Sequence, residues 1–299
     1  MNFSLSKHLT GKSKITLLTL LKLAAFTPTL LMAHTTPPIQ SKGDVPLKLY
    51  VFDCGTIEAR DLSLFNPLIK KGTQKTLASP CYLIQHAKGN LLWDTGLADE
   101  LIHNKDGIEV MEGAFKMSVT KTLASQLAEI NVKPSEIDYL TFSHLHNDHT
   151  GNAKYFTNAK WLMQKPEHIA AYHQDAQKYG YHPHDYKPLK GVKITDLSGQ
   201  HDLFGDGSVI IVPTPGHSAG HQSLFVDLPN TGPVVLSGDL YHFQENREQY
   251  GIPVWNNKKE TIHSFTRIDK LLDSTKATLW IHHDKAQFDS LKHSPSYYD

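Results

Sequence analysis

The chain has 299 residues, of which 30 are Lys or Arg, 30 are Asp or Glu and 19 are His. The resulting formal net charge of zero argues against a nucleic-acid-binding protein, and the apolar and charged contents of 39% and 20% exclude a disordered chain or a multi-span membrane protein. Two cysteines are too few for a disulfide scaffold. The unusual feature of the composition is the high number of histidines, because histidine is the commonest metal ligand.

The N-terminal 33 residues predict a secretory signal peptide. Three lysines within the first 14 residues precede a mostly apolar stretch, 15–33, that ends at the small residue Ala33. An uncleaved membrane anchor and an ordinary buried helix are the alternatives. Cleavage would leave 26 basic against 30 acidic residues, and this net negative charge strengthens the argument against nucleic-acid binding. The mature protein would then be secreted or periplasmic, without further membrane contact.

The following segment, 34–46, is rich in proline and polar residues and predicts an extended leader before a single folded domain over 47–299. Export would place Cys54 and Cys81 in an oxidising compartment. Both lie in apolar, strand-like runs, so two small buried side chains are the simpler interpretation, and a disulfide between them is the alternative.

Strands and helices alternate along the rest of the chain, which predicts one α/β domain with sheets inside and helices outside. Alternating or continuous apolar runs predict strands at 47–55, 81–86, 90–96, 137–144, 160–164, 209–217, 221–228, 233–239 and 277–283. Apolar residues spaced three or four apart, and Pro166 at a first helical position, predict helices at 120–130, 166–177 and 261–272.

Four metal-ligand side chains fall within six residues of the segment SHLHNDHTGN, 143–152. His144 and His146 are expected on one side of a strand, because strand side chains alternate, and Asp148 and His149 on the turn that follows. Imidazoles and a carboxylate suit zinc and similar divalent ions. One tetrahedral ion needs three or four ligands, so four in one loop hint at a second ion.

Three later segments extend this pattern, each at the end of a predicted strand. They are PGHSAGH with His217, SGD with Asp239, and IHHD with His282 and His283. Each alone is weak evidence, since a strand-end histidine is usually structural and Gly-Asp is usually a turn. Together they predict a metal site at the strand ends, where α/β proteins usually place their sites.

These motifs, in this order, resemble the metallo-β-lactamase superfamily, and most closely its N-acyl-homoserine lactonases, the quorum-quenching lactonases. The likeness runs from about Leu47 to the C-terminus. It is carried by the segments CYLIQHAKGNLLWDTGL, SHLHNDHTGN, TPGHSAGHQSLF and GDLYHFQEN. The resemblance implies an αββα sandwich and a metal-dependent hydrolase that opens the lactone ring by attack of a metal-bound hydroxide. A homodimer is also a family-level expectation.

The resemblance further implies a site that holds two metal ions. Zinc is the first candidate for both ions, and Fe, Mn or Co would also be compatible with these ligands. One ion would be held by His144, His146 and His217, and the other by Asp148, His149 and His283. Asp239 would bridge both ions. His283 is preferred to His282 because the family ligand stands just before an Asp. Asp94, in the WDTG turn, would support the metal loop, and Asp148 could pass a proton to the leaving alkoxide.

One position departs from the family pattern. The lactonases carry a Tyr three residues after the bridging Asp, and here that residue is His242. His242 could hydrogen-bond the substrate carbonyl instead, or its side chain could point away. The segment 168–187, and Phe65, Met111, Phe115 and Met117, could line a substrate pocket or simply be surface and core.

Other functions of the same fold remain open from sequence. The main rival is a secreted metallo-β-lactamase, although those enzymes generally lack a carboxylate that bridges both metals. A promiscuous lactone or ester hydrolase, a phosphotriesterase and a non-catalytic metal-binding protein are further alternatives, because a shared metal core does not fix the substrate.

Overall fold

The computed structural model describes residues 46–187, 189 and 191–299. The expected signal peptide and nearly all of the expected leader therefore lie outside the described residues, and both stay predictions. No helix within the described part of the chain is long and apolar enough to cross a membrane.

An eight-stranded sheet forms one half of the fold, with strand order β4-β5-β1-β2-β3-β6-β7-β8. Its first five strands pair antiparallel, and β3, β6, β7 and β8 run parallel. The bounds are β1 Lys48–Ala59, β2 Lys75–His86, β3 Gly89–Trp93, β4 Ile108–Val110, β5 Phe115–Ser118, β6 Tyr139–Thr141, β7 Lys160–Gln164 and β8 Lys193–Leu197.

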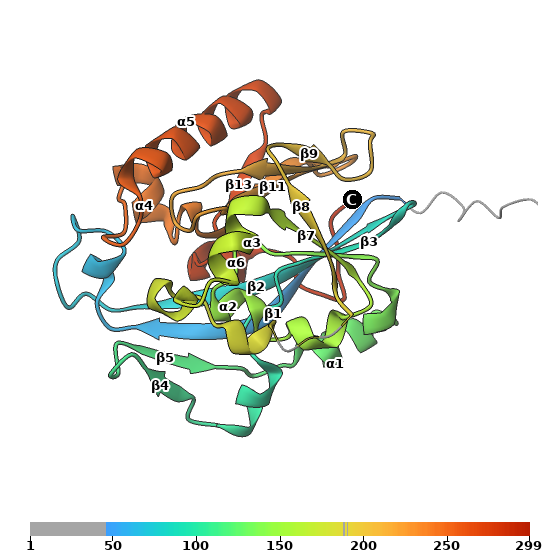
Figure 1. The fold of residues 1–299 in the computed structure, drawn as a ribbon. Helices are drawn as coiled ribbons and strands as arrows, with labels where there is room; N and C mark the ends of the chain where they lie inside the picture. The colour runs from blue at the N-terminus through green and yellow to red at the C-terminus, as the bar shows by residue number, and fades with distance from the viewer. Residues whose placement is uncertain (1–45, 188, 190) are drawn as a thin grey trace, which may run out of the picture. The chain divides into compact units, whose positions relative to one another are not determined.

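A five-stranded sheet, with order β13-β12-β11-β10-β9, forms the other half (Figure 1). Its bounds are β9 His201–Asp202, β10 Val209–Pro213, β11 Gln222–Leu228, β12 Gly232–Leu236 and β13 Thr278–Trp280. The helices are α1 Leu123–Glu129, α2 Asn147–Thr150, α3 Lys165–Ala171, α4 Gln244–Gln249, α5 Lys258–Thr275 and α6 Lys285–Ser290.

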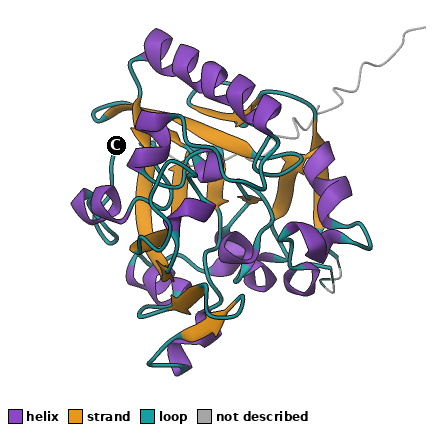
Figure 2. Ribbon diagram, turned by 90° about the vertical axis from the view of Figure 1, so that its left-hand side faces the viewer, coloured by secondary structure: helices purple, strands orange, loops and turns teal. Residues whose placement is uncertain are grey.

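Alternation along β1 shows why the two sheets stack between helices. Leu49 and Val51 pack into a core shared with β10, β11 and β12, whereas Phe52 points to the opposite face, against α1. The outer face of the five-stranded sheet is covered by α5 through Phe265 and Ile268. The order helix, sheet, sheet, helix confirms the predicted αββα sandwich, and Figure 2 shows helices outside both sheets.

Most predicted elements are found, with different ends. The helix predicted at 166–177 ends at Ala171, because turns and a 3-10 segment follow. The strand predicted at 137–144 ends at Thr141. After it, the backbone N–H groups of Ser143 and Leu145 donate to Asp94 and Glu167 rather than to a neighbouring strand. The loop that carries His144 and His146 is thus bound by side chains.

Cys54 and Cys81 form a disulfide between the adjacent strands β1 and β2. Both cysteines are buried, as predicted, but the interpretation as two free side chains was wrong. Strand pairing brings their Cα atoms to 5.9 Å, within bonding range. Gly96 lies directly against this pair: a Cβ there would stand 2.2 Å from Cys54 Cβ. The disulfide therefore packs beneath the loop that begins at Asp94.

Candidate metal centre

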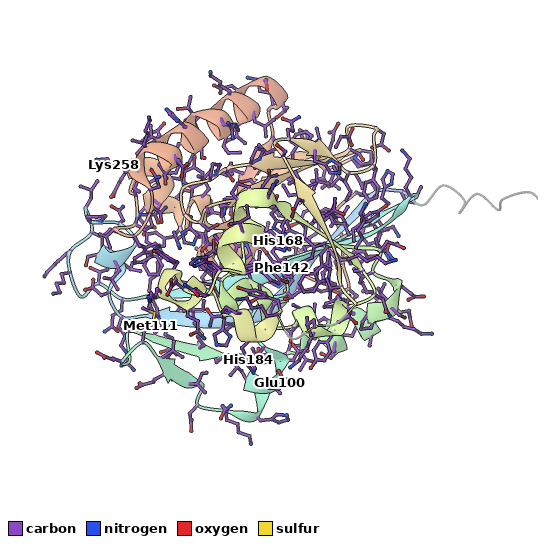
Figure 3. All side chains as sticks on the ribbon, in the orientation of Figure 1. Glu100, Met111, Phe142, His168, His184 and Lys258 are labelled. Carbon is purple, nitrogen blue, oxygen red and sulfur yellow. A yellow bond between two sulfur atoms is a disulfide. The ribbon has the colours of Figure 1, made fainter. Side chains whose placement is uncertain are left out.

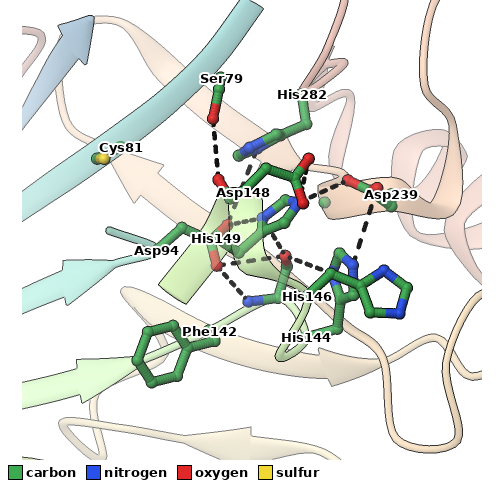
Figure 4. A network of polar contacts seen from close by, with 12 residues as sticks. Ser79, Cys81, Asp94, Phe142, His144, His146, Asp148, His149, Asp239 and His282 are labelled. Atoms are coloured by element: carbon green, nitrogen blue, oxygen red, sulfur yellow. Dashed lines mark hydrogen bonds and ion pairs between the residues drawn. The ribbon is translucent and has the colours of Figure 1, made fainter. Parts of the chain in front are cut away.

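The ligand candidates come from separate loops at one edge of the two sheets. His144 and His146 follow β6, His217 follows β10, Asp239 follows β12 and His283 follows β13. Helix α2 presents Asp148 and His149 in its single turn. Figure 4 shows how the side chains of the 144–149 segment and of Asp239 converge from distant parts of the chain.

The first group consists of His144, His146 and His217. The Nε2 atom of His217 lies 3.1 Å from His144 Nε2 and 3.2 Å from His146 Nδ1. Burial holds the pKa of His144 and that of His217 well below the usual value for histidine, so both rings are neutral. The structure thus brings the predicted first ligand set together, with three imidazole nitrogens that face one point, an arrangement suited to a divalent cation.

The second group consists of Asp148, His149 and His283. The Oδ2 atom of Asp148 lies 3.7 Å from His149 Nε2 and 3.5 Å from His283 Nε2. The neighbouring His282 lies against the ring of His149 with centroids 4.6 Å apart, and its Nδ1 is 3.9 Å from Asp94 Oδ2. His283 Nε2 faces both Asp148 and Asp239, in line with the choice of His283 over His282 as a ligand.

Asp239 separates the two groups and offers one oxygen to each. Its Oδ1 lies 3.2 Å from His149 Nε2 and 3.1 Å from His283 Nε2. Its Oδ2 lies 3.4 Å from His217 Nε2 and 3.9 Å from His144 Nε2. A carboxylate that bridges two ions needs this arrangement, with each oxygen directed at a different set of nitrogens.

The unpaired atoms of this site fit cations. His149 Nε2 and Asp239 Oδ1 are buried and lack a hydrogen-bond partner, which is costly unless something else binds them. Burial opposes ionisation of Asp239, but the surrounding histidines, His283 and His149 first, hold its carboxyl pKa well below the ordinary value. The buried Asp239 carboxylate, with imidazole nitrogens facing both of its oxygens, is thus available for divalent metal.

A further layer of side chains orients these candidate ligands. Asp94 Oδ1 accepts a hydrogen bond from Ser143 N at 2.7 Å, and its Oδ2 lies 3.2 Å from His149 Nδ1, so Asp94 supports the metal loop as predicted. His283 Nδ1 donates to the Ala78 carbonyl at 2.6 Å. Such contacts to the second ring nitrogen fix the tautomer and leave the other nitrogen free for a metal.

Glu167, near the start of α3, is a supporting residue that the sequence prediction missed. Its Oε1 accepts from Leu145 N at 3.0 Å, and its Oε2 accepts from Ser218 Oγ at 2.7 Å and Gly220 N at 2.8 Å. Leu145 lies between His144 and His146, whereas Ser218 follows His217. One buried carboxylate thus ties together the two loops that carry the first histidine group. Nothing in the local sequence distinguishes it from a surface helix residue.

His221 is a second supporting residue whose role the sequence did not reveal. Its Nε2 accepts a hydrogen bond from the backbone N–H of Asp239 at 2.8 Å, and its Nδ1 lies 2.9 Å from Thr214 Oγ1. The last histidine of PGHSAGH therefore positions the carboxylate between the two groups.

His242 points into the site, so the alternative that its side chain points away was wrong. Its Nε2 lies 3.3 Å from Asp239 Oδ2, and its ring packs 4.7 Å from that of Phe65. It lines a cavity of about 840 Å³ that also exposes Asp148 and Asp239. The residues singled out from sequence as a substrate pocket, Phe65, Met111, Phe115 and Met117, all line this cavity, as do six residues within 168–187.

The family model described as the metallo-beta-lactamase superfamily matches residues 75–262, more than half of the chain. The chain belongs to this superfamily. Similar proteins include the N-acyl homoserine lactonase AttM of Azorhizobium caulinodans, 27% identical over 85% of this chain and 99% of that protein. The N-acyl homoserine lactonase AiiA of Bacillus thuringiensis subsp. kurstaki is 29% identical over 84% of this chain and 98% of its own.

Solved structures give the same family relationship. An N-acyl homoserine lactone hydrolase with N-hexanoyl-L-homoserine at its catalytic metal centre matches with a TM-score of 0.73 and 28% identity, over 84% of this chain and 98% of that one. The dizinc lactonase AidC matches with a TM-score of 0.61 at 17% identity, over 85% and 94% of the two chains, which supports the superfamily fold.

The Glu167 clamp predicts an effect on metal affinity. Glu167→Gln keeps the side-chain volume but replaces one acceptor oxygen with a donor that faces the other donors. We expect the affinity for one metal equivalent to fall by about 10- to 100-fold, as for other residues that orient metal ligands. Chelator competition measures this, with surface Glu129→Gln as the control. Equal affinity in the two variants would contradict the clamp.

Proposed function

We propose that this protein is a dinuclear metal hydrolase that opens the lactone ring of N-acyl-homoserine lactones. The observation that carries the proposal is Asp239, with one oxygen toward each histidine group, at the wall of a cavity lined largely by apolar side chains. Lactonases similar to this chain over nearly their whole length support the substrate class.

The seven residues His144, His146, His217, Asp148, His149, His283 and Asp239 would hold the two ions, with zinc as the first expectation. Bound divalent ions supply an activated water at neutral pH and polarise a carbonyl oxygen. The water oxygen bonds to the lactone carbonyl carbon, the ring C–O bond breaks, and the product is an N-acyl homoserine. One proton must reach the leaving alkoxide during this step.

Asp148 is the candidate that moves this proton. Its side chain is 15% exposed, whereas the Asp239 side chain is 4% exposed, and both line the cavity. A carboxyl that reaches the substrate space can pass a proton to the leaving oxygen. His242, whose Nε2 lies beside Asp239, would donate a hydrogen bond to the carbonyl oxygen, at the position where the family resemblance implies a tyrosine.

We further propose that the protein acts outside the cytoplasm. The Cys54–Cys81 disulfide supports this location, because disulfides persist in oxidising compartments, and the N-terminal sequence predicts export.

Turnover of a defined lactone tests the proposed function. Metal-reconstituted protein is mixed with N-hexanoyl-homoserine lactone and acid release is followed, beside a long-chain homologue, a simple γ-lactone, nitrocefin and paraoxon. We expect the acyl-homoserine lactones to be the best substrates. No turnover of either, with robust nitrocefin hydrolysis, would overturn the proposal in favour of a β-lactamase.

The bridging role of Asp239 predicts a change in metal content. Asp239→Ala removes the oxygens offered to both groups, so we expect markedly less than two equivalents of metal by elemental analysis. Asp227→Ala, an exposed position on β11, should keep the wild-type content. Unchanged stoichiometry in Asp239→Ala would refute the bridge.

The placement of His242 predicts a loss of turnover without a loss of metal. His242→Phe keeps a ring against Phe65 but removes the hydrogen-bond donor, so we expect kcat to fall about 10²- to 10³-fold with little change in KM. Metal content should match that of the wild type, which separates this role from ligation. Exposed His263→Phe is the control, and a kcat within about twofold of wild type in His242→Phe would rule out the role.

A further inference from the structure

Two loops beside the mouth of the cavity expose apolar side chains followed by paired lysines. In the first loop Leu68 is 71% exposed and precedes Lys70 and Lys71. In the second, Val254 and Trp255 are 65% and 45% exposed. They precede Lys258 and Lys259, which are also exposed. The same pattern thus occurs at two places nearly 190 residues apart in the sequence.

The fold brings these loops together at one end of the molecule. Val254 N donates to the Leu64 carbonyl at 3.3 Å, and the rings of Trp255 and Phe65 are 5.3 Å apart. Met111, 72% exposed, lines the same cavity as Trp255. Met111 and Lys258 are both labelled on the left-hand side of Figure 3, and Figure 2 views the protein from that side.

Contrary to the expectation from the sequence that the mature protein has no membrane contact, we propose that this end of the protein docks reversibly on an anionic lipid surface. We call it the lipid face, and its members are Leu68, Met111, Val254, Trp255, Lys70, Lys71, Lys258 and Lys259. Exposed aliphatic side chains with a tryptophan suit the boundary between headgroups and acyl chains, and flanking lysines attract anionic lipid.

Charge favours a lipid surface over a second copy of this chain. None of these four lysines forms an ion pair with any described residue. The acids next to these lysines and to Met111 are Asp61, which holds Gly72 N, and the exposed Glu112 and Glu260. The positive excess would oppose two such faces meeting, but it complements anionic headgroups. The cavity opens at this face, so a docked protein would receive amphiphilic molecules directly from the membrane.

The single exposed tryptophan makes the contact measurable in the full chain. The chain has four tryptophans, and Trp93, Trp161 and Trp280 are buried. Vesicles of phosphatidylglycerol and brominated phosphatidylcholine should therefore quench mainly Trp255 fluorescence when the lipid face inserts. Binding through the N-terminal segment would leave this tryptophan unquenched. Trp255→Phe should remove the quenchable signal.

Two paired variants test the two halves of the lipid face. Lys70→Glu/Lys71→Glu should lower the partition coefficient about 30-fold or more, since each lysine near an anionic surface contributes about fivefold. Leu68→Ser/Val254→Ser should lower it about tenfold or more. The matched controls, exposed Lys160→Glu/Lys270→Glu and exposed Ile169→Ser, should partition and quench like the wild type.

The proposal is independent of the substrate assigned above, because fluorescence quenching requires no turnover. Vesicle binding without quenching, or no binding at saturating anionic lipid, would overturn it. Self-association in sedimentation experiments that Leu68→Ser/Val254→Ser abolishes, with no quenching by lipid, would instead assign this end of the protein to a second copy of the chain.

Discussion

The buried carboxylate of Asp239 is the interaction on which the rest of this structure depends. A charge this deep is unfavourable unless cations or donors surround it. Here imidazole nitrogens approach each of its oxygens from a different side, and the carboxyl groups of Asp94 and Asp148 lie close to the second histidine group. Two bound divalent ions would balance the charge of Asp239, so metal binding and stability of the site are coupled.

The protein holds this arrangement in place because backbone N–H groups near the candidate ligands donate to side chains instead of to neighbouring strands. Asp94 and Glu167 accept from the loop after β6, and His221 accepts from the backbone of Asp239. Each acceptor comes from a different segment of the chain than the backbone that it holds. The loops that carry the ligands are thus irregular in conformation but fixed in position, which suits a site whose ligand geometry must be precise.

The cavity and the lipid face give the metal centre its surroundings. Apolar side chains from β1, β2 and β5 line the cavity near His242, and the same lining continues outward to exposed Met111 and Trp255. The cavity is polar at its inner end and apolar at its mouth. This matches an amphiphilic substrate with a polar reactive ring and an apolar acyl chain. The proposed lactone and the proposed lipid contact both follow from this gradient.

The sequence by itself located the candidate metal loop through short-range spacing, and its resemblance to the metallo-β-lactamase superfamily implied the full ligand set and the αββα fold. His144, His146, Asp148 and His149 stand within six residues, and short apolar runs separated by turn signals predicted most of the strands. The tertiary structure alone decided which oxygen of Asp239 meets which histidines, where Glu167 acts, and that Cys54 and Cys81 are bonded. It also brought Leu68 and Trp255 together beside the mouth of the cavity. These features depend on contacts between residues far apart in the chain, and local periodicity carries no information about such contacts.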